Sequence, residues 1–411
     1  MLSFIGFLPA GYYAPAIPQM RAEFGVSLFR ATLGIVMYPV GFTVGPLLAA
    51  PLSELYGRRI IYKVCLPLVV LSCLGMAKAR SFDMFLVFRF FSSLFISGPF
   101  TVAGGTISDM WPARIRAPAV ILYATGGNVA AAFGPVLGGI VCYYTTWHWI
   151  FWSQMIYVGV LFVLVWFFVP ETYTPKIFAI TDKSVGTARQ KIITAMSRPV
   201  VMIFTEPIVA AVSAYLAFVY GLMFCSFSAY PIQFKESRGW NTRDASLPFL
   251  GIVAGIFIAV AMSPFFIRLY RKNPVPESRL YNACLGAILL PISLFWYGWT
   301  SDPSIPAIAS VTAGVGIGCS LLLLFLGITD LLVEIYTPRG IAASALAANG
   351  ALRTIAAAVF PLFSNQMFHK LGTNWGASLL GFIAILMLPI PFVLLRYGAS
   401  IRAKSRLAQP L

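Results

Sequence analysis

The sequence predicts an all-α membrane protein, with twelve transmembrane helices arranged as two related halves of six. Three observations support this fold class. Of the 411 residues, 59% are hydrophobic and only 10% are charged, whereas soluble domains carry about 25% charged residues. The apolar residues form stretches long enough to cross a bilayer core of roughly 30 Å as helices, and part of the sequence pattern occurs twice.

The apolar stretches define the predicted spans in order along the chain. Each span needs about twenty apolar residues of helix, and polar or charged breaks separate twelve such stretches. They cover residues 2–20, 31–53, 60–77, 84–108, 117–141, 148–169, 201–226, 246–268, 280–299, 304–329, 340–364 and 376–397. We therefore expect a multi-pass membrane protein embedded in the lipid bilayer.

The longest polar break separates six spans from six. We expect an N-terminal six-helix bundle at 1–169, a cytoplasmic linker at 170–200, a C-terminal six-helix bundle at 201–397 and a cytoplasmic tail at 398–411. Most of the 29 lysines and arginines lie in loops on the same side as the linker. The loops on the opposite side hold Arg21, Arg30, Lys78, Arg80, Lys235, Arg238, Arg243 and Lys370. Because basic loops stay in the cytoplasm, both termini are expected there.

The first span is rich in residues that interrupt helices. It contains Gly6, Pro9, Gly11, Pro15 and Pro18, so we expect it to be bent or broken. It lacks the basic region and cleavage site of a signal peptide. Because no cytoplasmic residues precede it, we expect that the chain as given lacks its true start; the alternative is a helix that is unwound for a functional reason.

The span at 117–141 carries a stripe of small residues. Gly127, Ala131, Gly134 and Gly138 lie at i, i+4, i+7 and i+11, so one face of the helix has almost no side chains and another helix can approach its backbone. Pro135 removes a backbone donor in mid-span and is expected to bend the helix. By itself, such a stripe usually indicates only tight packing.

Part of this pattern recurs in the second half of the chain. A shift of 223 residues aligns Gly127 with Gly350, and TISD at 106–109 matches GITD at 327–330. Two matches in the same order indicate two related halves. Repeated halves in membrane proteins are typical of transporters that work by alternating access.

Other classes of function are not indicated. The net charge of +16 follows the loops rather than a basic and aromatic motif, so no nucleic-acid partner is expected. The six cysteines lie in or next to apolar stretches without a CxxC pair, and no metal site is expected. Walker A, HExxH and GxSxG motifs are missing from the sequence, so we expect neither an enzyme with catalytic residues nor a cofactor.

Residues 45–59, GPLLAAPLSELYGRR, resemble the loop between helices 2 and 3 of the major facilitator superfamily, in a form similar to that of fungal drug:proton antiporters. Physically, Gly57 permits a tight turn, and Asp109 at the end of the fourth span is a candidate ion-pair partner for Arg58 or Arg59. The resemblance implies a gating set of Glu54, Gly57, Arg58, Arg59 and Asp109. Without the resemblance, the segment is equally consistent with a turn that carries basic anchors.

Residues 133–139, FGPVLGG, resemble the helix-5 antiporter motif of the same superfamily. The resemblance implies an antiporter set of Gly127, Gly134, Pro135, Gly138 and Gly139, and transport out of the cell. Further similar segments are PETY at 170–173, FTEP at 204–207 and PESRL at 276–280. The resemblance covers nearly the whole chain and implies the major facilitator fold.

Two charged residues are candidates for proton coupling. Arg89 lies at the position of the superfamily's helix-4 arginine that is linked to proton transfer, although Ser93 replaces the usual glycine four residues later. It is also consistent with an arginine that extends to the membrane interface. Glu206 is the acidic residue that best fits inside a span, where burial favours proton uptake. Because Pro207 follows it, it is also consistent with an acid in the first turn of a helix.

Polar, aromatic and basic side chains inside the spans are candidates for a substrate cavity. Arg353 in the eleventh span suits an anionic substrate or a helix C-terminus. The others are equally consistent with contacts between helices or an interfacial aromatic belt. The candidate set is Asn128, Gln154, Tyr215, Tyr220, Tyr230, Trp296, Asn349 and Arg353. The 34 phenylalanines and 9 tryptophans favour bulky, hydrophobic substrates.

We therefore expect a secondary active transporter that exports hydrophobic small molecules, such as drugs or secondary metabolites, in exchange for protons. A nutrient importer or uniporter on the same fold is the alternative that the scarcity of acidic residues in the spans favours. A transport-dead receptor or scaffold is a further alternative, which the complete gating set disfavours. The transporter is expected to act as a monomer in the plasma membrane.

Overall fold

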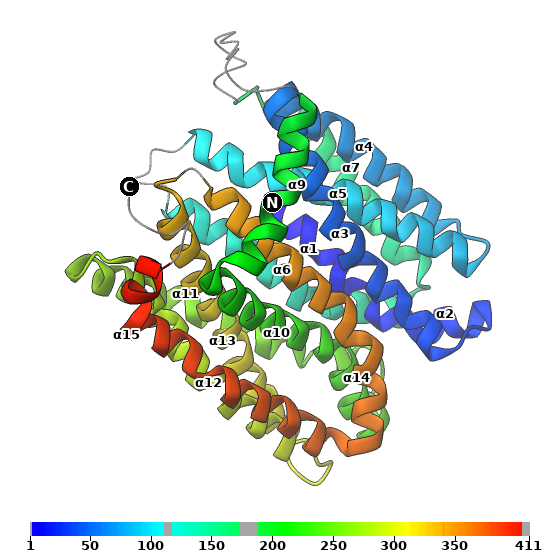
Figure 1. Ribbon diagram of the computed structural model, residues 1–411. Coiled ribbons are helices and arrows are strands. Elements are labelled where there is room, and N and C mark those ends of the chain that lie inside the picture. The colour runs from blue at the N-terminus through cyan, green and yellow to red at the C-terminus, as the bar shows by residue number, and fades with distance from the viewer. Residues whose placement is uncertain (1, 111–116, 173–187, 340, 405–411) are drawn as a thin grey trace. The chain divides into compact units, whose positions relative to one another are not determined.

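The computed structural model describes residues 2–110, 117–172, 188–339 and 341–404, and these residues form helices without any β-strand (Figure 1). Within these ranges, ten helices are long and apolar enough to span a membrane. The last of them, Ala342–Ala403, contains two spans that meet at Gly372, and the first predicted span is divided into shorter helices. The predicted all-helical fold with twelve spans is therefore confirmed.

The chain divides into two compact units, Met1–Ser197 and Arg198–Leu411. The first contains α1 (Leu2–Tyr12), η1 (Ala14–Ala16), α2 (Ile17–Phe24), α3 (Leu28–Tyr56), α4 (Arg58–Ala77), α5 (Phe82–Met110), α6 (Ala117–Tyr144) and α7 (His148–Phe168). The first span is broken into α1, η1 and α2, as its composition predicts. Pro15 and Pro18 lie in the first turns of η1 and α2, where a missing N–H costs no hydrogen bond.

Helix α9 (Ala188–Thr205) contains the boundary between the units. The second unit continues with α10 (Pro207–Tyr230), the π-helix η2 (Pro231–Ser237), η3 (Asp244–Ser246), α11 (Phe249–Lys272), η4 (Pro276–Arg279), α12 (Leu280–Trp299), α13 (Ala307–Tyr336), α14 (Ala342–Met387) and α15 (Pro389–Lys404). Gly372 has φ +76°, a backbone conformation that glycine adopts without strain, and this residue separates the last two spans.

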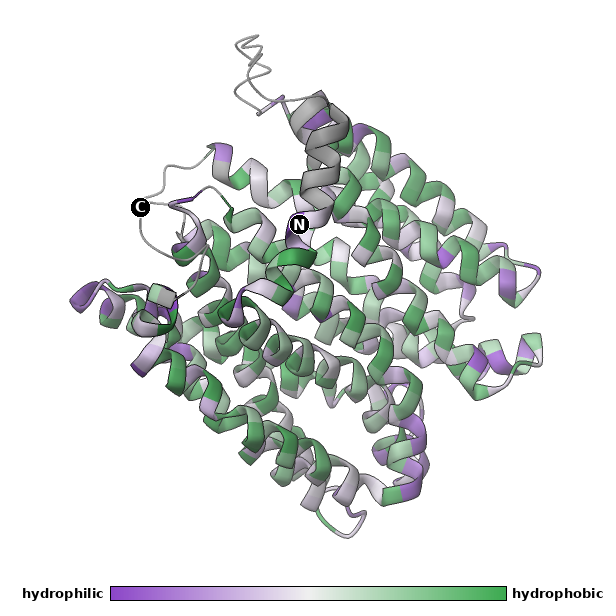
Figure 2. Cartoon of the chain, in the orientation of Figure 1, coloured by the Kyte–Doolittle hydropathy of each residue, from purple (hydrophilic) through white to green (hydrophobic). Residues whose placement is uncertain are grey.

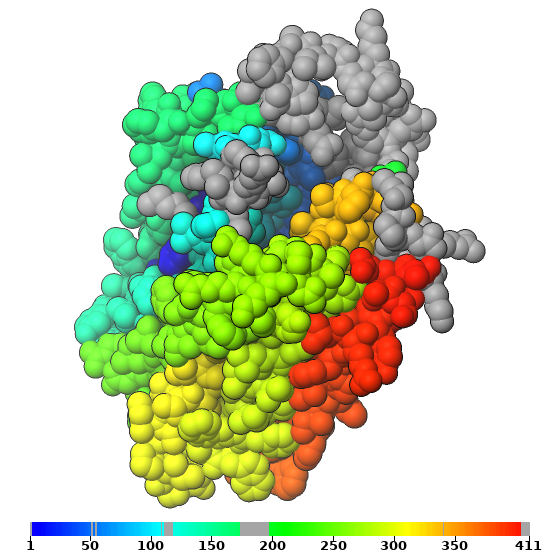
Figure 3. Space-filling view, turned by 90° about the vertical axis from the view of Figure 1, so that its left-hand side faces the viewer, coloured from blue at the N-terminus to red at the C-terminus, as the bar shows by residue number. Residues whose placement is uncertain are grey.

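The two units pack their helices in the same order. In the first unit α1 packs on α6, α3 packs on α5, and α4 contacts α5; in the second, α10 packs on α14, α11 packs on α13, and α12 contacts α13. Helix α15 lies on the surface of the second unit and contacts α12 and η4 (Figure 3). The repeat in the sequence is therefore a repeat in the packing.

Apolar residues cover most of the length of the helices, and hydrophilic residues gather at the helix ends and in the connections (Figure 2). Several helices extend beyond the apolar windows of the sequence. Helix α3 continues to Tyr56 and α5 to Met110, so the polar residues that follow each apolar window lie on helix ends.

Candidate functional site

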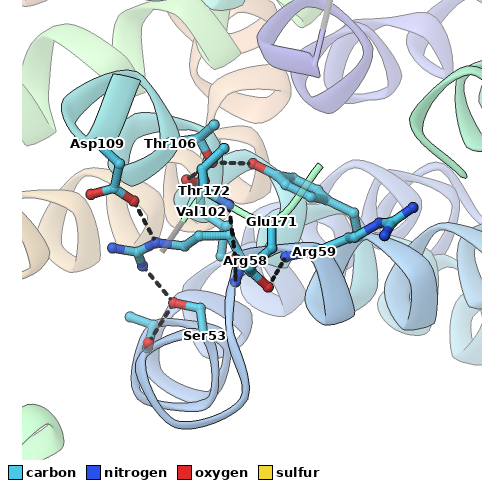
Figure 4. A network of polar contacts seen from close by, with 10 residues as sticks. Ser53, Arg58, Arg59, Val102, Thr106, Asp109, Glu171 and Thr172 are labelled. Atoms are coloured by element: carbon cyan, nitrogen blue, oxygen red, sulfur yellow. Dashed lines mark hydrogen bonds and ion pairs between the residues drawn. The ribbon is translucent and has the colours of Figure 1, made fainter. Parts of the chain in front are cut away.

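The predicted ion pair of Asp109 with the basic end of the motif is present, and the arginine that forms it is Arg58. Arg58 is the first residue of α4, and its Nε lies 3.2 Å from Oδ2 of Asp109 near the end of α5 (Figure 4). The Arg58 Nη1 also donates to the hydroxyl of Ser53 at 2.7 Å. The two charged side chains are only 14% and 21% exposed. Together these contacts join the end of α3, the start of α4 and the end of α5.

Two glycines, Gly57 and Gly105, lie next to this ion pair. Gly57 connects α3 to α4 with φ +91°, which a residue with a side chain rarely adopts. A Cβ at Gly105 would lie 2.9 Å from the Arg58 Cζ, so the guanidinium lies directly on the α5 backbone. The predicted role of Gly57 as a tight turn is consistent with this geometry, whereas Gly105 was not predicted. The side chain of Glu54 lies outside the described part of the structure.

The carboxylate of Glu171, which follows α7, binds the first turn of α4. It accepts hydrogen bonds from the backbone N–H groups of Arg58 at 2.8 Å and Arg59 at 3.3 Å (Figure 4). A carboxylate at this place satisfies unpaired donors at a helix start and is favoured by the helix dipole. The sequence signal for Glu171 was the PETY segment, to which no contact could be assigned without the fold.

The second unit has a corresponding network. Arg279 and Asp330 lie 221 residues after Arg58 and Asp109, and Arg279 Nη1 lies 3.8 Å from Oδ2 of Asp330. The Arg279 Nε lies closer, at 2.7 Å, to Oε2 of Glu334. This site was not predicted, although the match of TISD with GITD placed Asp330 and the PESRL segment contained Arg279.

Two further contacts complete the network of the second unit. The Arg279 guanidinium stacks on the ring of Tyr270, 3.6 Å from its centroid, and the Tyr270 hydroxyl donates to Glu334 at 2.5 Å. Glu277 of η4 forms an ion pair at 2.8 Å with Arg402 of α15. In each unit, a charged side chain on or just after the last span therefore binds the segment at the start of the third span.

The small-residue face of α6 packs on the broken first span. A Cβ at Gly134 would lie 2.7 Å from the carbonyl oxygen of Leu8, and one at Gly138 would lie 2.3 Å from that of Tyr12. A Cβ at Gly127 would approach the ring of Phe7 at 3.0 Å. Pro135 and Gly139 are also buried in α6. The predicted tight packing of this face is therefore confirmed, and its role in antiport stays a prediction.

Arg89 is fully buried inside the first unit and does not extend to an interface. Its Nη2 donates to the carbonyl of Pro9 at 2.6 Å and its Nε to that of Gly34 at 3.2 Å. Its Nη1 has no hydrogen-bond partner among the residues that the structure describes. The aromatic rings within 6 Å of its Cζ are those of Tyr13, Tyr38 and Phe151. Arg89 on α5 thus forms hydrogen bonds with α3 and with α1, the first helix of the broken first span.

Ser93, which replaces the glycine usual in the superfamily, is accommodated by a glycine on the facing helix. Its hydroxyl donates to the carbonyl of Phe90 at 2.8 Å, and a Cβ at Gly41 of α3 would lie 2.1 Å from that hydroxyl. Helices α3 and α5 can therefore still pack closely, because the small residue at this contact is Gly41 on α3 rather than a glycine on α5.

Glu206 is buried at the start of α10, with 1% exposure. Its Oε2 accepts a hydrogen bond from the hydroxyl of Tyr336, at the end of α13, at 3.0 Å. Glu206 is the N-cap residue of α10, but its side chain forms no capping hydrogen bond with the first turn. Tyr336 was not predicted from the sequence.

The substrate candidates of the first unit are bonded within their bundle. The Asn128 side chain donates to the carbonyl of Ala124, one turn earlier in α6, at 3.0 Å. Gln154 is fully buried on α7, and its amide nitrogen lies 3.5 Å from the hydroxyl of Ser92. These contacts agree with the alternative interpretation, that the two residues join or stabilise helices.

The candidates of the second unit divide into buried and accessible residues. Asn349 is buried on α14 and donates to the Ser213 hydroxyl at 3.2 Å, and Tyr215 is fully buried. Trp296 is 49% exposed on α12. Arg353 of α14 is partly exposed, and its Cζ lies 4.7 Å from the ring centroid of Tyr220 and 5.0 Å from that of Phe325.

Tyr230 lines a small cavity inside the second unit, among residues of α10 to α14. Its hydroxyl and that of Tyr297, which also lines the cavity, have no hydrogen-bond partner in the described part of the chain. The cavity volume of about 30 Å³ is enough for a water molecule, which needs roughly 10–15 Å³. A bulky hydrophobic substrate does not fit there.

The two units repeat one packing of apolar helices, and each has an ion-pair network near the start of its third span. This arrangement is typical of a membrane transporter built from internal repeats. The sequence comparison gives the family. Residues 1–361 match the sequence profile of the Major Facilitator Superfamily. The chain belongs to this superfamily, and the predicted resemblance is confirmed.

Curated relatives span nearly the whole chain. It is 37% identical to the multidrug transporter mdrA of Aspergillus fumigatus over 98% of its own length and 70% of that protein. It is 36% identical to the MFS-type transporter traF of Penicillium crustosum over 96% of its length and 84% of the relative. The efflux pump FUB11 of Gibberella moniliformis is 35% identical, with 96% and 71% covered.

A solved structure with the same fold is that of the proton:xylose symporter XylE bound to 6-bromo-6-deoxy-D-glucose. It superposes with a TM-score of 0.69 at 17% sequence identity, covering 96% of this chain and 94% of the symporter. At this identity the likeness shows the fold alone.

Proposed function

We propose that this chain exports hydrophobic small molecules, such as drugs or secondary metabolites, by alternating access and in exchange for protons. The names of its relatives, a multidrug transporter and efflux pumps, support the direction of transport. The observation that carries the proposal is the Arg58–Asp109 ion pair, which joins three helix ends through contacts that can open and close. The transporter acts as a monomer in the plasma membrane.

In this proposal the ion pair biases the equilibrium between two conformations of the transporter. A contact present in one conformation and absent in the other stabilises the first by its own free energy. Gly57, Arg58, Arg59 and Asp109 then act as a gating set, with Glu171 holding the first turn of α4. The glycine face of α6 on the first span supplies a smooth surface for helix movement.

Proton coupling is assigned to Glu206, because its carboxylate is buried, with 1% exposure, at the start of α10. We expect Glu206→Gln to abolish proton movement that depends on the exported compound. The measurement is proton flux in proteoliposomes with an imposed pH gradient and a panel of lipophilic compounds. Glu236→Gln is the matched control, since Glu236 is exposed and pairs with His369. Export without proton movement in both the wild type and Glu206→Gln would refute the coupling and leave a uniporter.

The uniporter is the second candidate function because one observation favours it. The acidic residues that the structure describes lie in connections or within two turns of a helix end, and Arg89 is held by carbonyl groups and rings. In the flux experiment, a uniporter moves the compound at the same rate with and without the pH gradient.

A further inference from the structure

The chain contains two histidines, and each pairs with a glutamate at the end of its unit opposite to the arginine network. In the first unit, Nε2 of His148, the first residue of α7, lies 3.8 Å from Oε1 of Glu23 on α2. In the second unit, Nε2 of His369 on α14 lies 2.9 Å from Oε2 of Glu236 on η2. Each glutamate lies at the end of the first span of its unit, and each histidine lies next to the connection between the last two spans. The two pairs are therefore related by the repeat.

The contacts of His369 determine which of its ring nitrogens carries a hydrogen. Its Nδ1 lies 2.8 Å from the backbone carbonyl oxygen of Asn365. A carbonyl oxygen can only accept, so Nδ1 is the donor. A neutral imidazole has a single N–H, and its Nε2 would then present a lone pair to the ionised Glu236 carboxylate at 2.9 Å. The second hydrogen bond therefore forms only when the ring is protonated and both nitrogens donate.

The corresponding pair of the first unit has a contact that needs no protonated histidine. The indole Nε1 of Trp147 donates to Oε2 of Glu23 at 2.5 Å, and the His148 ring stacks on the indole with the ring centroids 3.8 Å apart. An indole N–H is always a donor. Glu23 therefore stays bound to the start of α7 in either charge state of His148.

The other charged side chains around Glu236 and His369 are engaged with different groups. Lys370, the next residue of α14, points about 100° around the helix from His369. On η2, η3 and the nearby connections, charged side chains bind hydroxyl groups, backbone carbonyl groups or each other. They are Lys235, Arg238, Arg243, Asp244 and Asp302.

We infer that Glu236 and His369 form a pH-dependent contact, which joins the end of the seventh span to the end of the eleventh span in acid and is lost as the pH rises. The joined segments are the π-helix η2 and the last turn of α14 before Gly372. Single π-helical turns are frequent at functional sites. The Trp147 contact makes the first unit independent of pH at the corresponding place.

The direction of the effect follows from the charge of the ring. A free histidine has a pKa of about 6.5, so the protonated ring and its bond to Glu236 are present below this value and are lost at higher pH. The loop charges predict that this end of the unit faces away from the cytoplasm, so the contact responds to the pH outside. Glu206 lies at the opposite end of α10. The contact is therefore separate from the proposed proton coupling, and Glu236→Gln should break it without abolishing coupled proton movement.

The first test is an NMR titration of the two histidines in the purified full chain, with isotope-labelled histidine. His148→Phe and His369→Phe assign the two signals. We expect Glu236→Gln to weaken proton binding by His369 about two- to fivefold, the range of a surface ion pair, and to leave the titration of His148 unchanged. An unchanged titration of His369 in Glu236→Gln overturns the inference.

The second test is hydrogen exchange of the η2 amides at about pH 5.5 and about pH 8.5, on either side of the titration of histidine. In acid, we expect η2 to exchange about two- to fivefold faster in His369→Phe than in the wild type. At the higher pH the two should exchange equally. His148→Phe is the matched control and should leave η2 and the start of α7 unchanged at both pH values.

Equal exchange of η2 in acid, or a difference that persists at the higher pH, overturns the inference. Neither experiment measures export, so this inference and the export proposal can fail separately.

Discussion

The two units differ in the geometry of the arginine at the predicted cytoplasmic end. Among the described contacts, Arg58 of the first unit lies 3.2 Å from the carboxylate of Asp109 and donates to the hydroxyl of Ser53. Arg279 of the second unit lies 2.7 and 3.8 Å from two carboxylates and stacks on a ring. The ion pair of the first unit is longer than the shorter one of the second, so we expect it to be the easier contact to break.

The charged link to the last span of each unit is also different. In the first unit the acid, Glu171, lies after the last span and binds backbone N–H groups. In the second, the acid is Glu277 in the connection, and the last span supplies Arg402. The repeat thus preserves the position of the arginine and its acid, while the surrounding partners differ.

The largest expected effect comes from removing the carboxylate that the repeat shares. Asp109→Asn should shift the conformational equilibrium by about 1–2 kcal/mol, a factor of roughly 5–30, and lower the export rate to a similar degree. Asp330→Asn should change the rate less than about twofold, since Glu334 still holds Arg279 at 2.7 Å. Initial export rates from proteoliposomes measure both, with thermal unfolding as a check on folding. Equal losses in the two variants would contradict the comparison.

A smaller effect is expected from a methyl group under Arg58. In Gly105→Ala the new Cβ would lie 2.9 Å from the Arg58 Cζ and displace the end of that flexible side chain. We expect the export rate to fall a few-fold, for a cost of about 1 kcal/mol, with little loss of thermal stability. Gly104→Ala is the matched control, because a Cβ there would meet nothing within 4 Å. An unchanged rate in Gly105→Ala would show that the position of Arg58 does not limit transport.

The smallest effect is expected in the second unit, at Tyr270. Tyr270→Phe removes the hydroxyl that donates to Glu334 at 2.5 Å and keeps the ring under Arg279. It should destabilise the protein by about 0.5–1 kcal/mol and leave transport nearly unchanged. Tyr270→Leu removes the ring as well and should cost roughly 0.5–1 kcal/mol more. The midpoint of thermal unfolding in detergent compares the two variants; identical midpoints would show that the ring does not stabilise Arg279.

Much of the fold follows from local features of the sequence. Apolar length predicts the spans, and the prolines of the first span predict its break into α1, η1 and α2. The spacing of Gly127, Gly134 and Gly138 predicts a face that another helix can approach. These predictions succeed because a helix in a bilayer must satisfy its own hydrogen bonds, so its length and face can be read from nearby residues.

The site was predicted only in part. The pairing of Asp109 with Arg58 or Arg59 was expected from the positions of these residues at the ends of spans, whereas Glu171, Gly105 and Tyr336 act across 47 to 130 residues of sequence. The local sequence pattern does not show which helix ends lie next to each other, because these contacts depend on how the helices pack.

The sequence by itself determined that the chain is helical, crosses the membrane repeatedly and consists of two related halves, since each of these depends on hydrophobicity, helix length and repeat spacing. Only the tertiary structure decided which charges meet. Arg89 is buried and donates to the carbonyl groups of Pro9 and Gly34, while the Arg353 guanidinium lies close to the rings of Tyr220 and Phe325. The physical reason is that the cost of a charge inside a membrane depends on the groups around it, and packing brings those groups from distant parts of the chain.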